Sequence, residues 1–225
     1  MKNLVLRSIM GLLNLLLIMG LSLFLAAGTL KYWEGWSYLL IFVLACVIIT
    51  VYFLMKDPDL IRLRLKAGPM AEKRPVQKII QLFTSLIFIA FFILAGLDHR
   101  FGWSNVPHPV VIAADIATAL AFTFIFSVFR ENSYTSGIIE IASRQHVISS
   151  GPYSIVRHPM YSGALALLVA TPVALGSWWS LLLAVPMLIL IILRVVDEEQ
   201  LLRRNLSEYE EYCRQVPYRL LPRIW

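Results

Sequence analysis

The residues best suited to chemistry are concentrated between Gly151 and Gly163. In this stretch Arg157 and His158 precede Pro159, and proline is well tolerated in the first turn of a helix. Free backbone N–H groups at a helix N-terminus, together with a guanidinium, form a binding site for an anion such as a carboxylate. Arg157 taken alone is equally consistent with anchoring at a membrane surface, but anchoring does not explain so dense a cluster.

A second candidate site follows the last apolar stretch, where Arg194 precedes three consecutive acids at 197–199. Arg194 and Glu198 are four residues apart, so both side chains lie on one face of a helix. One acid could hold an ammonium group. The alternative interpretation is a solvated acidic helix face that Arg203 and Arg204 balance.

The elements that must position these residues are membrane helices. Of 225 residues, 59% are hydrophobic and 15% are charged, against about a quarter in soluble domains. A helix needs roughly 20 residues to cross the hydrocarbon core. Windows near that length lack any charged residue at 8–30, 35–55 and 79–97, and window 101–129 carries the single acid Asp115. Asp115 lies only about five residues into the helix expected at 110–129, where it could reach the membrane interface, which favours a structural role.

A fifth charge-free window covers 159–193 and is too long for one crossing. Thr171-Pro172 and Gly176-Ser177 are helix-breaking pairs within it, so we expect two shorter helices in a hairpin. The first window resembles a signal peptide, but its apolar run is too long and further spans follow, which favours an uncleaved helix. The fold class expected is all-α: a polytopic membrane helix bundle of about six helices with a cytoplasmic pocket.

The basic residues indicate the topology. If the N-terminus, the 56–78 loop, the 130–158 loop and the tail from Arg194 share one side, only Lys31 and Arg100 fall opposite. The positive-inside rule then places both termini in the cytoplasm. The formal charge of +6 therefore indicates contact with the lipid bilayer rather than binding of nucleic acid. No metal-ligand spacing and no glycine-rich phosphate loop is present in the sequence.

Residues 130–225 resemble the isoprenylcysteine carboxyl methyltransferase family, including its bacterial relatives. The motifs that carry the resemblance are His146-Val147, Gly151-Pro152-Tyr153, Arg157-His158-Pro159-x-Tyr161-x-Gly163, Glu198-Glu199 and Glu208-Tyr209-x-x-Tyr212. The stretch Arg100–Ser104 is similar to the bacterial branch, whereas Asn205-Leu206-Ser207 stands where relatives often have Phe-Gly. A bacterial inner-membrane protein is therefore expected.

The resemblance implies that S-adenosylmethionine binds in a cytoplasmic pocket without a Rossmann domain. The cofactor-binding residues it implies, with Arg157 added as the anion site, are His146, Val147, Gly151, Tyr153, Arg157, His158, Pro159, Tyr161, Glu198 and Glu199. His146 and Val147 would line the adenosine end, and Gly151 and Tyr153 the pocket wall. His158, Pro159 and Tyr161 would hold the methionine part. Glu198 would take the ammonium group, unless the alignment slips by one to Glu199.

The resemblance also implies a catalytic residue, Arg194, which would face the carboxylate of the acceptor. Residues 1–129 are then a four-helix membrane scaffold, and residues 130–225 are a methyltransferase region with a helical hairpin and an amphipathic tail. The function expected is methylation of a carboxylate on a lipid-like or lipidated acceptor by S-adenosylmethionine.

Three alternatives remain open on the sequence alone. A methyltransferase acting on a phospholipid amine or a small thiol would keep the same cofactor motifs. A membrane reductase of the steroid-reductase type would need more basic residues, for the phosphates of a nicotinamide cofactor, than 130–160 supplies. A transporter or scaffold would be expected to show internal repeats, which the sequence lacks.

Overall fold

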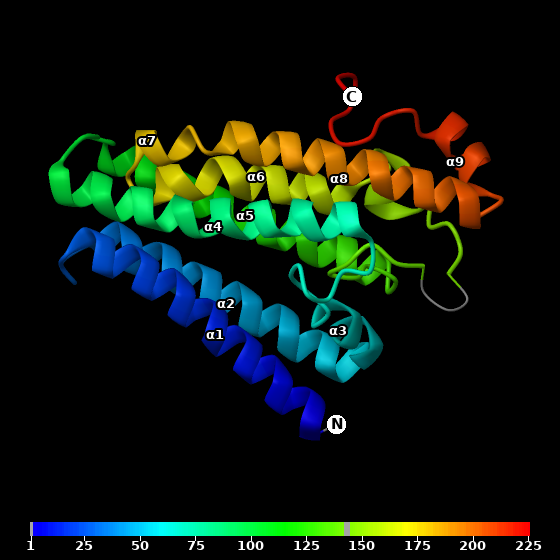
Figure 1. Cartoon of the computed structure of the whole chain (residues 1–225), viewed down its shortest axis with the longest axis horizontal. Coiled ribbons are helices and arrows are strands. Elements are labelled where there is room, and N and C mark those ends of the chain that lie inside the picture. Colours follow the sequence, from blue (N-terminus) through cyan, green and yellow to red (C-terminus); the bar gives the residue numbers. More distant parts are fainter. Residues whose placement is uncertain (1, 142–144) are drawn as a thin grey trace.

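The computed structural model describes residues 2–141 and 145–225, and within these ranges every regular element is a helix (Figure 1). Five helices in this part of the chain are long and apolar enough to cross a membrane: α1 (Lys2–Ala27), α2 (Trp33–Lys56), α4 (Pro75–Phe101), α5 (His108–Glu131) and the stretch Trp178–Asn205. Large apolar side chains cover their outer faces, as Leu25 of α1 shows with 72% of its surface exposed. Such faces suit lipid and not water. The predicted all-α membrane bundle is confirmed.

The last charge-free window folds as a hairpin. Its first arm is α6 (Pro159–Ala174), and its second is α7 (Trp178–Leu181) continued by α8 (Ala184–Asn205). Ser177 caps α7, because its Oγ accepts a hydrogen bond of 2.9 Å from the backbone three residues later. Pro172, expected to break this window, does not end the first arm but lies inside the last turn of α6, which continues to Ala174. With 16 residues, α6 is shorter than the five spans, so the six expected helices are five long ones and this one.

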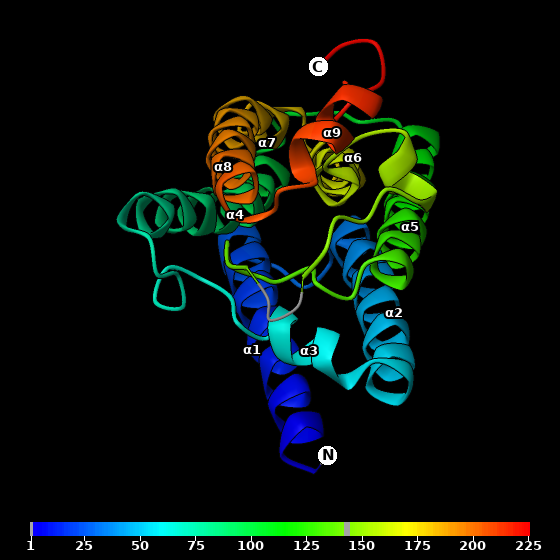
Figure 2. The same cartoon turned by 90° about the vertical axis from the view of Figure 1, so that its right-hand side faces the viewer.

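Three short helices gather at one end of the bundle: α3 (Pro58–Arg64), the 3-10 turn η1 (Gly151–Ser154) and α9 (Tyr209–Gln215). Both termini lie toward the same end, on the right of Figure 1. Seen from that end, the long helices surround the segment that follows α5 (Figure 2). This end, expected to be cytoplasmic, is called the pocket end below, and the other is called the closed end.

The closed end is held by Asp98, near the C-terminus of α4. One carboxylate oxygen accepts a hydrogen bond of 2.7 Å from the backbone N–H of Ser104, and the other accepts one of 2.5 Å from Ser177. The side chain of Asp98 is buried, with 1% of the residue exposed. The Arg100–Ser104 stretch, singled out in the sequence for its bacterial character, therefore connects α4 to the turn of the hairpin, far from the pocket end.

Helix α5 joins the first helices to the hairpin. At Gly163 of α6, a Cβ atom would lie 2.6 Å from Cγ1 of Ile125 on α5, so only glycine permits this close packing. On another face of α5, the buried Asp115 accepts a hydrogen bond of 2.9 Å from Ser37 of α2. Asp115 thus links two helices, in line with the structural role predicted for it.

Candidate functional site

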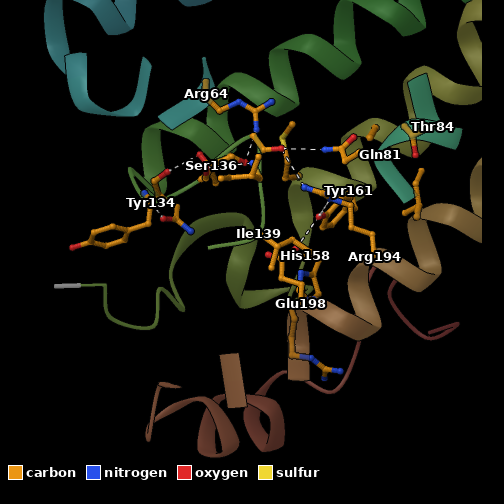
Figure 3. Close-up of a pocket in the computed structure, with 18 of the residues that line it drawn as sticks. Arg64, Gln81, Thr84, Tyr134, Ser136, Ile139, His158, Tyr161, Arg194 and Glu198 are labelled. Atoms are coloured by element: carbon orange, nitrogen blue, oxygen red, sulfur yellow. Dashed lines mark hydrogen bonds between the residues drawn. The ribbon is translucent and has the colours of Figure 1, made fainter. Parts of the chain in front are cut away.

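A cavity of about 430 Å³ opens at the pocket end, within the roughly 300–1,000 Å³ typical of small-molecule sites. Its wall has two chemical characters. Aromatic side chains of α2 and α4 form an apolar part at membrane depth, made by Tyr38, Phe42, Phe88, Phe91 and Phe92. Polar and charged side chains of α3, α6, α8 and the segment after α5 form the rest (Figure 3).

Most of the residues predicted from the sequence line this one cavity. Those in its wall are His146, Val147, Tyr153, Arg157, His158, Tyr161, Arg194 and Glu198. The predicted residues outside the lining set are Gly151, Pro159 and Glu199. The cavity also takes side chains from 1–129, so the expected scaffold supplies part of its wall.

Three of the lining residues form a hydrogen-bonded chain between α6 and α8. The hydroxyl of Tyr161, in the first turn of α6, donates to Oε2 of Glu198 at 2.7 Å. Nε of Arg194 donates to that hydroxyl oxygen at 3.0 Å. Arg194 and Glu198 lie one helical turn apart on α8, so Tyr161 bridges an acid and a base that face the cavity together.

The guanidinium of Arg194 is also held from the opposite side. Its Nη1 donates to Oε1 of Glu72 at 2.8 Å and to Oε1 of Gln77 at 3.0 Å, and its Nη2 donates to the carbonyl of Gly137 at 3.2 Å. The Glu72 side chain is fully buried, with 0% exposed. With the bond to Tyr161, four of the five N–H groups of Arg194 have protein acceptors.

Sequence reasoning missed Glu72 and Gln77. Glu72 is the only acid between Asp59 and Asp98, which is a weak signal in a segment otherwise rich in Lys and Arg. Nothing in the sequence connects it to Arg194, which lies more than a hundred residues further on.

Arg157, in the cavity wall, forms a buried ion pair with Glu199, which lies outside the lining set. Nε of Arg157 donates to Oε1 of Glu199 at 2.8 Å, and Arg219 donates to Oε2 at 3.0 Å. Arg157 also donates to the carbonyls of Val216 and Pro217, each at 2.8 Å. The predicted anion-binding position of Arg157 is therefore filled by a carboxylate of the chain itself. Glu198 lines the cavity and Glu199 points away, because neighbouring helix positions are about 100° apart.

His158 is the predicted residue with the least satisfied side chain. Only 5% of the residue is exposed, and its Nε2 is a buried atom without a hydrogen-bond partner among the described residues. Oε1 of Glu199 lies 3.4 Å from it, but the geometry does not make a hydrogen bond. A buried polar atom without a partner is costly, so its position in a cavity wall suits a polar group of a ligand.

The segment between α5 and α6 builds the remaining wall. His146 meets Tyr134 at 3.2 Å, measured from Nδ1 to the hydroxyl oxygen. Tyr153 is buried in η1, and burial raises the pKa of its hydroxyl. Gly151 adopts a φ of +54° at the start of η1, so it shapes the chain rather than the wall. Pro159 is the first residue of α6, as predicted.

Arg64 also lines the cavity, and the sequence analysis did not select it. It ends α3, and its Nη1 donates to the carbonyl of Ser136 at 3.0 Å. Its guanidinium lies 5.1 Å from the ring centre of Phe129. Burial lowers its pKa, and the nearby charge of Arg194 lowers it further, whereas Tyr161 and Tyr153 act in the opposite direction. In the sequence Arg64 is one of seven Lys and Arg residues in the 56–78 loop, so nothing distinguished it.

Comparison with known proteins adds two findings. The model of the phospholipid methyltransferase family matches residues 109–208, which include α5, α6, α8 and most of the predicted site. The delta(14)-sterol reductase TM7SF2 of Mus musculus is 31% identical over 90 residues, which are 39% of this chain and 22% of the reductase. The chain therefore corresponds to about a fifth of that relative's length.

The family match supports a coarser form of the sequence-based prediction. Phospholipid methyltransferases are grouped with the membrane methyltransferases that resemble isoprenylcysteine carboxyl methyltransferase, and the match does not extend to that narrower family. The sterol reductase agrees with the alternative that was kept open. The chain is thus an integral membrane protein whose residues 109–208 match the phospholipid methyltransferase family, which supports a membrane methyltransferase.

Proposed function

We propose that this protein transfers a methyl group from S-adenosylmethionine to the polar head of a lipid-like or lipidated acceptor. The observation that carries the proposal is the two-part cavity. The chain Glu198–Tyr161–Arg194 and an aromatic wall at membrane depth border one space, inside and beside the region that matches membrane methyltransferases. An acceptor with an apolar chain could reach the polar residues without leaving the bilayer.

The polar residues fit the cofactor. The carboxylate of Glu198 can pair with the ammonium group of the methionine part, and Nε2 of His158 offers a buried polar atom without a hydrogen-bond partner among the described residues. His146 and Val147 lie in the wall where the resemblance expects the adenosine. When bound, the cofactor supplies an electrophilic methyl group on a sulfonium.

The chain itself must align the acceptor with the methyl group and remove water from the acceptor. An in-line displacement needs the nucleophile about 3–3.5 Å from the methyl carbon, with fixed dipoles replacing water. A carboxylate is already a nucleophile, so its methylation requires no base. In this reaction we assign Arg194 the role of facing the acceptor carboxylate, through its one N–H that has no acceptor among those described.

A phospholipid amine is the second candidate acceptor. Glu72 neutralises the charge of Arg194, which weakens its attraction for a carboxylate, and the matching family is named for phospholipids. An ammonium group would have to lose a proton before its nitrogen attacks, so this reaction needs a base. The carboxylates in the cavity wall are Glu140 and Glu198.

A direct test is calorimetric titration of the detergent-solubilised protein with S-adenosylhomocysteine. We expect saturable binding that Glu198→Gln and Tyr161→Phe each weaken, since the first removes a charge and the second a hydrogen bond. Glu210→Gln, an exposed acid on α9, is the matched control and should bind as the wild type does.

The competing reductase is tested in the same experiment with NADPH as the ligand. Binding of NADPH without binding of S-adenosylhomocysteine by a folded protein would refute the methyltransferase proposal and favour the reductase. Binding of neither would refute both enzymes.

A further inference from the structure

Three arginines line the cavity, Arg64, Arg157 and Arg194, and they differ in how their charge is balanced. Arg194 is paired with the fully buried Glu72 and has acceptors for four of its N–H groups. Glu72 therefore balances the charge of Arg194, and other groups of the chain accept most of its hydrogen bonds. A strong anion in the cavity would need another cation to pair with.

Arg64 is that cation. Among the described residues it has no acidic partner within ion-pair distance, and its contacts are a hydrogen bond to the Ser136 carbonyl and the face of Phe129. The other lining Arg, Arg157, is paired with Glu199. A partly buried guanidinium with unused N–H groups gains much more from an anion than one that is already paired.

The position of Arg64 separates it from the proposed cofactor contacts. In Figure 3 Arg64 and Glu198 lie on opposite sides of the labelled set, with Tyr161 and Arg194 between them. Gln81 and Ser136 lie on the Arg64 side, and the Ser136 hydroxyl donates to Glu140, a lining acid whose charge Lys66 and Lys73 balance. The charge of Arg64 itself therefore stays available to an anion.

We propose that Arg64 binds an anionic group in the head of the acceptor, either a phosphate diester or a carboxylate. The inference rests on the proposed function, because it takes the Glu198 side of the cavity as the cofactor side. It names the acceptor class as an anionic or zwitterionic amphiphile, whose apolar chain lies against the aromatic wall of α2 and α4. It also gives the 56–78 loop a role, since that loop carries α3 to the cavity.

The experiment measures binding of single-chain amphiphiles to the whole protein in dodecyl maltoside. The probes are dodecyl phosphate, laurate and uncharged dodecanol, each titrated against the wild type, Arg64→Gln, Arg64→Lys and Arg62→Gln. Arg62→Gln is the matched control, because Arg62 lies on the same helix but is exposed and paired with Asp59. S-adenosylhomocysteine is titrated against each variant in parallel.

We expect the wild type to bind at least one anionic probe more tightly than dodecanol. Arg64→Gln should weaken that binding by about 10- to 100-fold, the range of a charge-assisted hydrogen-bonded pair, and Arg64→Lys by less. Binding of dodecyl phosphate alone would identify a phosphate group, and binding of laurate would identify the carboxylate. Affinity for S-adenosylhomocysteine should be unchanged, which also shows that the variant is folded.

Three outcomes would overturn the inference. They are equal binding of the anionic probes by wild type and Arg64→Gln, no preference of the wild type for any anion, and loss of S-adenosylhomocysteine binding in both Arg64 variants. The last would assign Arg64 to the cofactor. A wild type that binds the anionic probe but not S-adenosylhomocysteine would refute the proposed function while leaving the anion site in place.

Discussion

The two ends of the bundle both place a buried acid among polar neighbours, yet they serve different purposes. At the closed end each oxygen of Asp98 accepts hydrogen bonds from the chain, and the partners are neutral serine groups. At the pocket end the acids face arginines, and the cluster borders a cavity. There Nε2 of His158 and most N–H groups of Arg64 have no hydrogen-bond partner among the described residues. Incomplete hydrogen bonding beside a cavity, and not burial of charge, therefore marks the site.

The largest expected effect is from Arg157→Ala at the pocket end. It leaves Glu199 buried without its closest partner, which should cost about 3–5 kcal/mol of unfolding free energy. Thermal and denaturant unfolding in detergent measures this. Arg214→Ala, which removes an exposed pair with Glu211, should change stability by less than about 1 kcal/mol. Equal effects of the two changes would mean that the Arg157 cluster does not hold the pocket end together.

Glu72→Gln should have the next largest effect, about 2–3 kcal/mol, because it removes the counterion of a buried arginine while keeping a hydrogen-bond acceptor. The free charge of Arg194 should then bind laurate more tightly than in the wild type. Titration with laurate beside an unfolding curve measures both effects. Lower stability without a gain in laurate affinity would argue against Arg194 as the residue that faces a carboxylate.

Asp98→Ala tests the closed end. The loss of its hydrogen bonds to Ser104 and Ser177 should destabilise the protein by about 1–3 kcal/mol. Binding of S-adenosylhomocysteine at a temperature where the variant is folded should stay as in the wild type. If cofactor affinity fell with stability, the two ends would be coupled and the contrast between them would be wrong.

The smallest expected effect concerns Glu140 in the cavity wall. Burial alone would raise the pKa of this carboxyl, but Lys66 and Lys73 bring it below its ordinary value of 4.5. A lowered folded-state pKa gives stability that is present above pH 4.5 and is lost as the pH falls below it. Glu140→Gln should therefore flatten the acid side of the stability curve. Because both lysines are exposed, the change should be small, and an unchanged curve would show that the pair is fully screened.

Much of the fold could be predicted because membrane helices follow a local rule, the length of sequence without charge. The windows at 8–30, 35–55, 79–97 and 101–129 correspond to α1, α2, α4 and α5. The end of the first hairpin arm could not be located from the sequence, because α6 continues past Pro172 to Ala174.

The residues of the site were predictable only where they share a short stretch of sequence. Arg157, His158 and Tyr161 precede or begin one helix, and Glu198 follows Arg194 by one turn, so each group is recognisable by spacing. Glu72 and Arg64 reach the cavity through tertiary contacts across the bundle. Nothing in the local pattern of the 56–78 loop indicates such contacts.

The backbone of 216–220 lies against the start of α6 and fixes it from outside the bundle. The amide groups of Arg157 and His158 each donate to carbonyls there, of Tyr218 and Arg219, at 2.9 Å. Ser162 donates to the Leu220 carbonyl at 2.6 Å. A chain shortened before 216 would keep α1 to α8 but would lose these hydrogen bonds at the start of α6, so its ligand-binding wall would be unsupported.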